Sequence, residues 1–113
     1  MELLRKDRLI KLRKKNRGNT KLVKAIDNLI EDIELANWKD KFEMLKKRPD
    51  ADRIHGDNFY FFDINIHRTM IMILFDEQEA EILWVGNHDG YDKTFKGNKK
   101  VIETWIRNQG KIK

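Results

Sequence analysis

Hydrophobic residues in the first third of the chain recur at the spacing of an α-helix. The segment from Lys21 to Ala36 is the clearest case, because its apolar residues share one face of a predicted helix. That face contains Leu22, Val23, Ile26, Leu29, Ile30 and Ile33. An earlier basic segment, Leu3–Lys15, is also compatible with a helix, and Gly18-Asn19-Thr20 predicts a stop followed by a new N-cap.

A shorter helix is predicted before the only proline of the chain. Trp38, Phe42 and Leu45 form an apolar stripe at helical spacing. Asn37, followed three positions later by an aspartate, resembles a capped start, and Pro49 ends the segment because proline breaks helices.

After Gly56 the pattern changes to that of β-strands. Phe59–Ile66 alternates aromatic or β-branched residues with polar ones, and Thr69–Phe75 is continuously apolar. With Ala80–Val85 as a third apolar segment, the pattern predicts three consecutive antiparallel strands. The predicted connections are the tight His67-Arg68 link, the turn Asp76–Glu79 and the polar loop Gly86–Lys93, and a final short helix is predicted over Asn98–Asn108.

The predicted elements are helices, followed by strands and a final helix, and this order is typical of an α+β fold. We expect the N-terminal helices to pack on one face of a small antiparallel sheet, followed by a short C-terminal helix. Met1–Leu4 is also compatible with an extra edge strand. The length of 113 residues suits one core, so we expect a single domain over residues 1–113.

Charge is distributed unevenly along the chain. Residues 1–24 carry ten Lys or Arg and two acids, whereas residues 25–63 carry ten acids and six bases. The net charge is +5. A concentrated basic stretch is typical of proteins that bind an anionic partner such as RNA, and a solvated helix face has the same composition.

Composition excludes several kinds of protein. The chain has no cysteine, so disulfides and thiolate metal ligands are excluded. The longest apolar run, Met70–Phe75, is far shorter than a membrane span, and the first residues lack the apolar core of a signal peptide. We therefore expect a soluble, cytoplasmic protein that has no contact with a membrane.

Candidate chemistry is concentrated in Asn87–Lys93, directly after the last predicted strand. This segment combines an imidazole, two carboxylates, a phenol and an ammonium group, and histidine transfers protons readily near neutral pH. An ordinary polar turn has a similar composition. Arg68 can grip a phosphate with its fork of donors, or form a surface ion pair. The three histidines, His55, His67 and His88, lack the close spacing of metal ligands, so we expect no metal site.

Five short segments follow one another in a recognisable order: Ala36–Lys39, Pro49–Asp52, Phe62–Ile64, Arg68 and Val85–Lys93. Together they resemble the HigB branch of the RelE-like toxins. That branch typically shows a tryptophan-lysine pair, a proline followed by alanine and aspartate, a phenylalanine-asparagine-isoleucine strand, a strand-opening arginine and a closing threonine-histidine-x-x-tyrosine-aspartate-lysine. The resemblance covers roughly residues 36–95, over half the chain.

The resemblance implies a RelE-like fold and the toxin component of a type II toxin–antitoxin system. Such a toxin is an endoribonuclease, usually ribosome-dependent, that cuts mRNA and inhibits translation. It uses no metal or cofactor, because the 2′-hydroxyl of the RNA attacks the adjacent phosphorus. The implied partners are mRNA, the ribosome and a cognate antitoxin, commonly a helix-turn-helix DNA-binding protein, and a heterotetramer is one form of that complex.

The resemblance also implies roles for individual residues. His88 matches the motif histidine and is expected to transfer a proton, with Asp92 orienting it or shaping the segment. Tyr91 would orient the RNA or relay a proton. Lys93 would stabilise negative charge, and Arg68 would clamp the scissile phosphate. Further RNA contacts are expected from Arg53, His55, His67 and Lys96.

The sequence departs from the family pattern at several positions. Leu83 or Trp84 stands where the third strand often carries arginine, and Asn87 replaces threonine. Asp89-Gly90 replaces residues that are often bulkier or basic. Two alternatives therefore stay open: a RelE-fold protein that binds ribosome, RNA or another protein without cutting, and an unrelated small α+β interaction domain. The basic segment would face ribosomal RNA or an acidic antitoxin.

Overall fold

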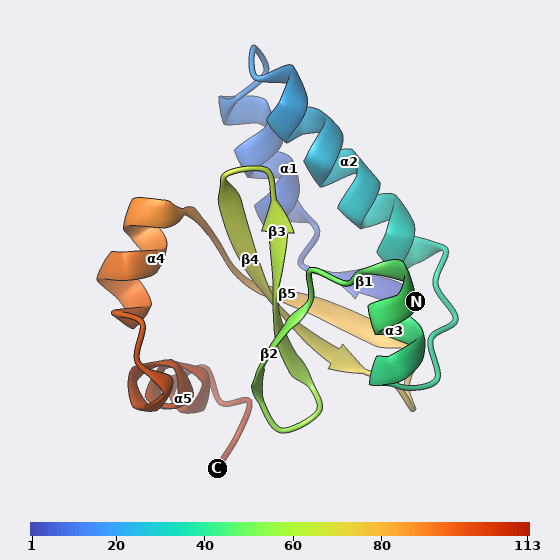
Figure 1. Ribbon diagram of the computed structural model, residues 1–113, viewed down its shortest axis with the longest axis vertical. Coiled ribbons are helices and arrows are strands. Elements are labelled where there is room, and N and C mark those ends of the chain that lie inside the picture. Colours follow the sequence, from blue (N-terminus) through green and yellow to red (C-terminus); the bar gives the residue numbers. More distant parts are fainter.

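The computed structural model describes all 113 residues as an α+β fold with helices on both faces of a five-stranded mixed sheet (Figure 1). The elements, in chain order, are β1 (Glu2–Leu4), α1 (Asp7–Lys15), α2 (Thr20–Glu34), α3 (Lys41–Lys47), β2 (Asp52–His55), β3 (Phe59–Ile64), β4 (His67–Leu74), β5 (Glu79–Asn87), α4 (His88–Phe95) and α5 (Lys99–Asn108). No helix is both long and apolar enough to cross a bilayer.

The strands lie in the order β1-β5-β4-β3-β2. The three predicted strands form β3, β4 and β5, and they pair antiparallel as expected. The edge strand expected near the N-terminus is also present, and it pairs parallel with β5, so the sheet is mixed. Strand β2 was not predicted, because Asp52–His55 is a short edge strand with little hydrophobic character.

The larger core lies between the sheet and the N-terminal helices. The apolar face predicted for the second helix is confirmed: Leu22, Ile26, Leu29 and Ile33 of α2 are fully buried. They pack against the Tyr60, Phe62 and Ile64 face of β3. The Asn19 side chain accepts a hydrogen bond from the backbone N–H of Leu22 at 3.1 Å, which is the predicted N-cap.

The N-terminal helices pack on one face of the sheet as expected, but the prediction that helices cover one face alone is wrong. Figure 1 shows α4 and α5 on the side of the sheet away from α1 and α2. They cover a second core that contains Phe59, Phe61, Met70, Leu83, Phe95, Ile102 and Ile106. Because residues 59–62 are all buried, alternate aromatic side chains of β3 need cover on opposite faces.

The predicted connection at His67-Arg68 is also wrong. The turn between β3 and β4 is Asn65-Ile66, and both His67 and Arg68 already belong to β4. Asn65 adopts a positive φ of 62°, a conformation that asparagine tolerates better than most residues. Arg68 therefore lies opposite Asp63 on the neighbouring strand, on the face covered by α4 and α5.

The expected polar loop Gly86–Lys93 is instead the end of β5 followed by a helix. Helix α4 begins at His88 because the Asn87 side chain caps it, accepting a hydrogen bond from the backbone N–H of Gly90 at 2.8 Å. Only Tyr91 and Phe95 supply an apolar face, so the hydrophobic pattern was too short to show a helix.

The third helix is shorter than the apolar stripe of Trp38, Phe42 and Leu45 predicted. Helix α3 begins after Asp40, whose side chain accepts a hydrogen bond from the backbone N–H of Glu43. Trp38 therefore precedes the helix, and Phe42 is 66% exposed instead of buried. Likewise, α1 begins at Asp7, because the preceding residues form β1.

Candidate active site

The Arg68 side chain lies over two aromatic rings that contact each other. Its guanidinium carbon lies 5.1 Å from the ring centre of Phe61 on β3 and 5.1 Å from that of Tyr91 on α4. Arginine is attracted to aromatic faces by the ring quadrupole, and both contacts limit the rotation of a long side chain. Strand β4 and helix α4 therefore place a preoriented cation at the end of the sheet where β5 passes into α4.

Two carboxylates lie at the edges of this guanidinium. Arg68 Nε donates a hydrogen bond to Asp63 Oδ1 at 3.1 Å, and Arg68 Nη2 lies 3.6 Å from Asp52 Oδ2. Burial alone would lower the pKa of Arg68, but the hydrogen bond and charge of Asp63, followed by the charges of Tyr91 and Asp52, raise it above its ordinary value. Nη1 has no protein partner and stays available to a ligand.

Asp63 is fixed through its backbone as well as its side chain. Its N–H donates to Asp50 Oδ2 at 3.0 Å, and its carbonyl accepts from Arg48 Nη2 at 3.2 Å. Arg48 and Asp50 also pair directly at 2.8 Å, and Arg48 contacts Asp32 of α2 at 3.3 Å. This ion-pair network ties the end of β3 to the N-terminal helices and holds Asp63 in register beside Arg68.

A cluster of aromatic side chains packs between the sheet and α4, next to Arg68. The rings of Phe61 and Tyr91 lie 5.0 Å apart, and Phe95 lies 5.4 Å from Phe61 and 5.0 Å from Trp84. The Trp84 indole lies across Gly86, where any β-carbon would approach it to 2.5 Å. Glycine at position 86 therefore lets Trp84 lie flat against β5 and support α4.

His88 and Asp92 form a second pair on the first two turns of α4. His88 Nε2 lies 3.3 Å from Asp92 Oδ2, and their side chains are 79% and 58% exposed. His88 lies three positions before Tyr91, so the two project from neighbouring points of one helix face. Lys93 is exposed and forms no ion pair. These residues, which the sequence placed on a loop, therefore lie on a helix.

A shallow hollow of about 190 Å³ opens beside Arg68. It is lined by Asp52, Arg53, Ile54, Phe61, Tyr91, Gly97, Lys99 and Ile102. Three of these, Asp52, Phe61 and Tyr91, contact Arg68, so the hollow shares part of its wall with the surroundings of the guanidinium. A larger hollow of about 440 Å³, next to Phe42 and Asp57, lies at the opposite end of the sheet.

Of the other predicted RNA contacts, two histidines lie away from Arg68. His67 pairs with Asn87 across the sheet and lies on the opposite face from Arg68. Its Nδ1 is buried without a partner, and burial lowers its pKa. His55 packs against Phe59 with ring centres 6.0 Å apart.

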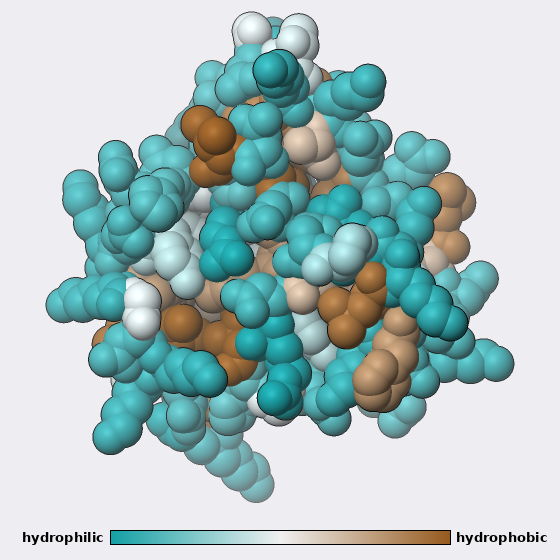
Figure 2. All heavy atoms as spheres, viewed as in Figure 1, coloured by the Kyte–Doolittle hydropathy of each residue, from teal (hydrophilic) through white to brown (hydrophobic).

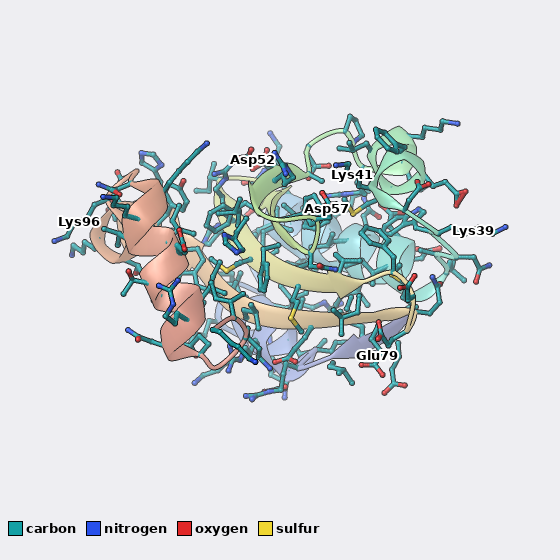
Figure 3. All side chains as sticks on the ribbon, turned by 90° about the horizontal axis from the view of Figure 1, so that it is seen from below. Lys39, Lys41, Asp52, Asp57, Glu79 and Lys96 are labelled. Carbon is teal, nitrogen blue, oxygen red and sulfur yellow. The ribbon has the colours of Figure 1, made fainter.

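The two predicted basic contacts differ in their distance from the site. Arg53 lines the hollow, but its guanidinium donates to the Gly56 carbonyl at 3.1 Å and lies 3.8 Å from Asp57. Lys96 follows the end of α4 and points outward from the C-terminal helices (Figure 3). In the same view, Asp52 lies on the sheet side of those helices.

Sequence reasoning missed Asp63 and Asp52. The available signal was the spacing from Asp63 to Arg68, which becomes a cross-strand pair once the turn is placed at Asn65-Ile66. Asp52 could not be found, because β2 was not predicted. No three His, Asp or Glu side chains converge as metal ligands. Arg68, Asp63 and His88 together offer a cation, a proton acceptor and a proton donor, which are the groups that transfer at a phosphate ester requires.

Comparison with known proteins identifies one family. Residues 23–94 match the family model of HigB toxins, described as the RelE-like toxic component of a toxin-antitoxin system. The matched region runs from α2 to α4 and contains Arg68, His88, Tyr91 and both carboxylates. A comparison with curated proteins finds no match to this chain.

Proposed function

Since the chain belongs to the HigB family of RelE-like toxins, the toxic components of toxin–antitoxin systems, we propose that it is a type II toxin that cleaves mRNA. In this proposal residues 1–113 form one toxin domain that acts in the cytoplasm, cuts mRNA on the ribosome and thereby inhibits translation. Membership of the family implies a cognate antitoxin. We propose that this antitoxin is a helix-turn-helix DNA-binding protein, which can assemble with the toxin as a heterotetramer.

The observation that carries the proposal is the position of Arg68. Its guanidinium lies over the neighbouring rings of Phe61 and Tyr91, and its Nη1 is unpartnered. A guanidinium oriented before substrate binds stabilises a phosphorane at a low cost in reorganisation. Arg68 would therefore hold the scissile phosphate next to the hollow that Asp52, Phe61 and Tyr91 help to line.

The remaining side chains supply roles for cleavage by the 2′-hydroxyl. The hydroxyl oxygen attacks the neighbouring phosphorus, and the bond to the 5′-oxygen breaks. His88 would give a proton to that leaving oxygen, with Asp92 orienting the imidazole from one helical turn away. Tyr91 would orient the RNA by holding Arg68 in place, and Lys93 would contribute positive charge.

Expression from a tightly controlled promoter tests the proposal. The unaltered chain is compared with His88→Ala, growth is followed, and the 5′ ends of cellular mRNA are mapped. The proposal expects growth arrest with new, translation-dependent 5′ ends, and His88→Ala is expected to lose both. Normal growth with soluble, folded protein and unchanged mRNA would contradict it.

A non-cutting binder of ribosome, RNA or another protein is the second candidate function. It is favoured by the negative charge around Arg68, because Asp63 and Asp52 both neutralise the guanidinium and Asp89 lies in the first turn of α4. In the same experiment, growth arrest without new mRNA ends would support this binder.

A further inference from the structure

No residue has yet been assigned as the general base, the group that removes the proton from the 2′-hydroxyl. His88 donates a proton in the same turnover, and Lys93 supplies positive charge, so neither is the initial acceptor. The anionic groups beside the guanidinium are Asp63 and Asp52. We propose that Asp63 is the general base of the cleavage reaction, an inference that rests on the proposed function.

The contacts of the two carboxylates show which one is better suited to act as the base. Asp63 Oδ1 accepts the Arg68 Nε–H at 3.1 Å, whereas Asp52 reaches the guanidinium only at 3.6 Å. The other oxygen of Asp63 has no protein partner, and the side chain is 52% exposed. A substrate hydroxyl can therefore reach an oxygen whose direction is set by a charge-assisted hydrogen bond.

The two carboxylates also differ in how firmly their backbone is held. Asp63 is fixed by hydrogen bonds to Asp50 and Arg48 at the end of a central strand. Asp52 opens the edge strand β2, whose pairing with β3 is irregular after Arg53. A general base needs a defined position within hydrogen-bond reach of the proton it accepts, and Asp63 has the more rigid support.

The guanidinium connects this base to the phosphate. Asp63 accepts a hydrogen bond from Nε of Arg68 only, so Nη1 of the same guanidinium can donate to a non-bridging oxygen of the phosphate. An arginine that binds both groups places the carboxylate beside the sugar of the same nucleotide.

The step balances without a further reactant. The 2′-hydroxyl proton passes to Asp63 while the 2′-oxygen forms a bond to phosphorus. The bond from phosphorus to the 5′-oxygen breaks, and that oxygen takes a proton from His88. The products are a 2′,3′-cyclic phosphate and a 5′-hydroxyl. Proton transfer from Asp63 to His88 through solvent then restores both groups.

The test measures single-turnover cleavage of a short mRNA on programmed ribosomes by the full chain and its variants. Asp63→Asn keeps the size of the side chain and is expected to slow cleavage on the order of 100-fold or more. Asp27→Asn is the matched control, because it makes the same carboxylate-to-amide change in an exposed pair with an arginine, Arg13, away from the site, and it is expected to stay within about threefold of the unaltered chain. Binding of an mRNA with a 2′-deoxy nucleotide at the cleavage site is expected to be as tight for Asp63→Asn as for the unaltered chain.

A second substrate distinguishes the loss of the general base from the loss of the general acid. It carries sulfur in place of the 5′-oxygen at the mapped cleavage site, and a thiolate leaves without needing a proton. His88→Ala is expected to recover most of its rate on this mRNA, whereas Asp63→Asn stays slow because its 2′-hydroxyl still needs a base. Cleavage by Asp63→Asn at the unaltered rate, or faster, would overturn the inference, as would recovery of that variant with the sulfur substrate. Absence of cleavage by the unaltered chain would overturn the proposed function as well, so the two failures are distinguishable.

Discussion

The guanidinium of Arg68 lies over the ring of Tyr91, 5.1 Å from its centre, and this contact joins strand β4 to helix α4. The two residues are 23 positions apart in the chain. The His88–Asp92 pair lies on the same helix as Tyr91, so the contact connects the cation on the sheet to the helix that carries the pair. Loss of either the guanidinium or the ring is therefore expected to alter the whole site.

Replacing Tyr91 distinguishes the ring from the hydroxyl. Tyr91→Phe keeps the face that stacks on Arg68, so we expect mRNA cleavage within about threefold of the unaltered chain. Tyr91→Ala removes the ring, and with a cation–π contact worth roughly 1–2 kcal/mol at a partly buried site we expect a loss of about tenfold or more. Cleavage rates of both variants check this, and a Tyr91→Phe variant as slow as Tyr91→Ala would indicate that the hydroxyl relays a proton.

Gly86→Ala is expected to destabilise the fold. A β-carbon at position 86 would meet the Trp84 indole at 2.5 Å, so the ring, and α4 above it, must shift. Such overpacking costs roughly 1–3 kcal/mol in the free energy of unfolding, measured by urea denaturation. Gly18→Ala is the matched control, because open space surrounds that position, and it is expected to change stability little. Equal stability of the two variants would contradict the close contact.

His67 makes the stability of the fold depend on pH. Burial lowers its pKa below the ordinary value of 6.5, so the unfolded chain binds a proton at His67 more tightly than the folded chain does. The resulting stability is fully present above the unfolded pKa and is lost as the pH falls from there through the lower pKa of the folded state. We expect His67→Gln to lose less stability than the unaltered chain between pH 8 and pH 5, by urea denaturation at each pH. Parallel losses in the two proteins would argue against this role for His67.

The hairpin of α1 and α2 carries a cluster of exposed basic residues without ion pairs, and its surroundings are mostly hydrophilic (Figure 2). The cluster is Lys11, Lys14, Lys15, Arg17, Lys21 and Lys24. If it contacts RNA, replacing three of these residues by glutamine should weaken RNA binding and reduce the slope of log K against log salt by about 2.

The matched control for the basic cluster is a variant with Lys6 and Arg13 replaced by glutamine, because both residues already form ion pairs. We expect a smaller change in the salt slope for this variant than for the triple replacement. An unchanged salt slope in the triple variant, together with weaker binding of a purified antitoxin, would assign the cluster to the antitoxin instead of RNA.

Local sequence patterns predicted the elements whose hydrophobic repeat is long. Helix α2 was predicted because its apolar residues repeat over several turns, and the strands β3 and β4 because their residues are aromatic, β-branched or continuously apolar. Helix α4 was missed because Tyr91 and Phe95 are too few to show a period. The turn at Asn65-Ile66 was misplaced because no glycine or proline marks it.

The α+β class, the basic N-terminal segment and the His88–Lys93 motif could be predicted from residue order and local periodicity alone. The cover of both sheet faces by helices, and the positions of Asp63 and Asp52 beside Arg68, became visible only in three dimensions. The reason is that strand register and the packing of α4 are set by contacts between residues far apart in the chain, and a one-residue change in register moves a side chain to the other face.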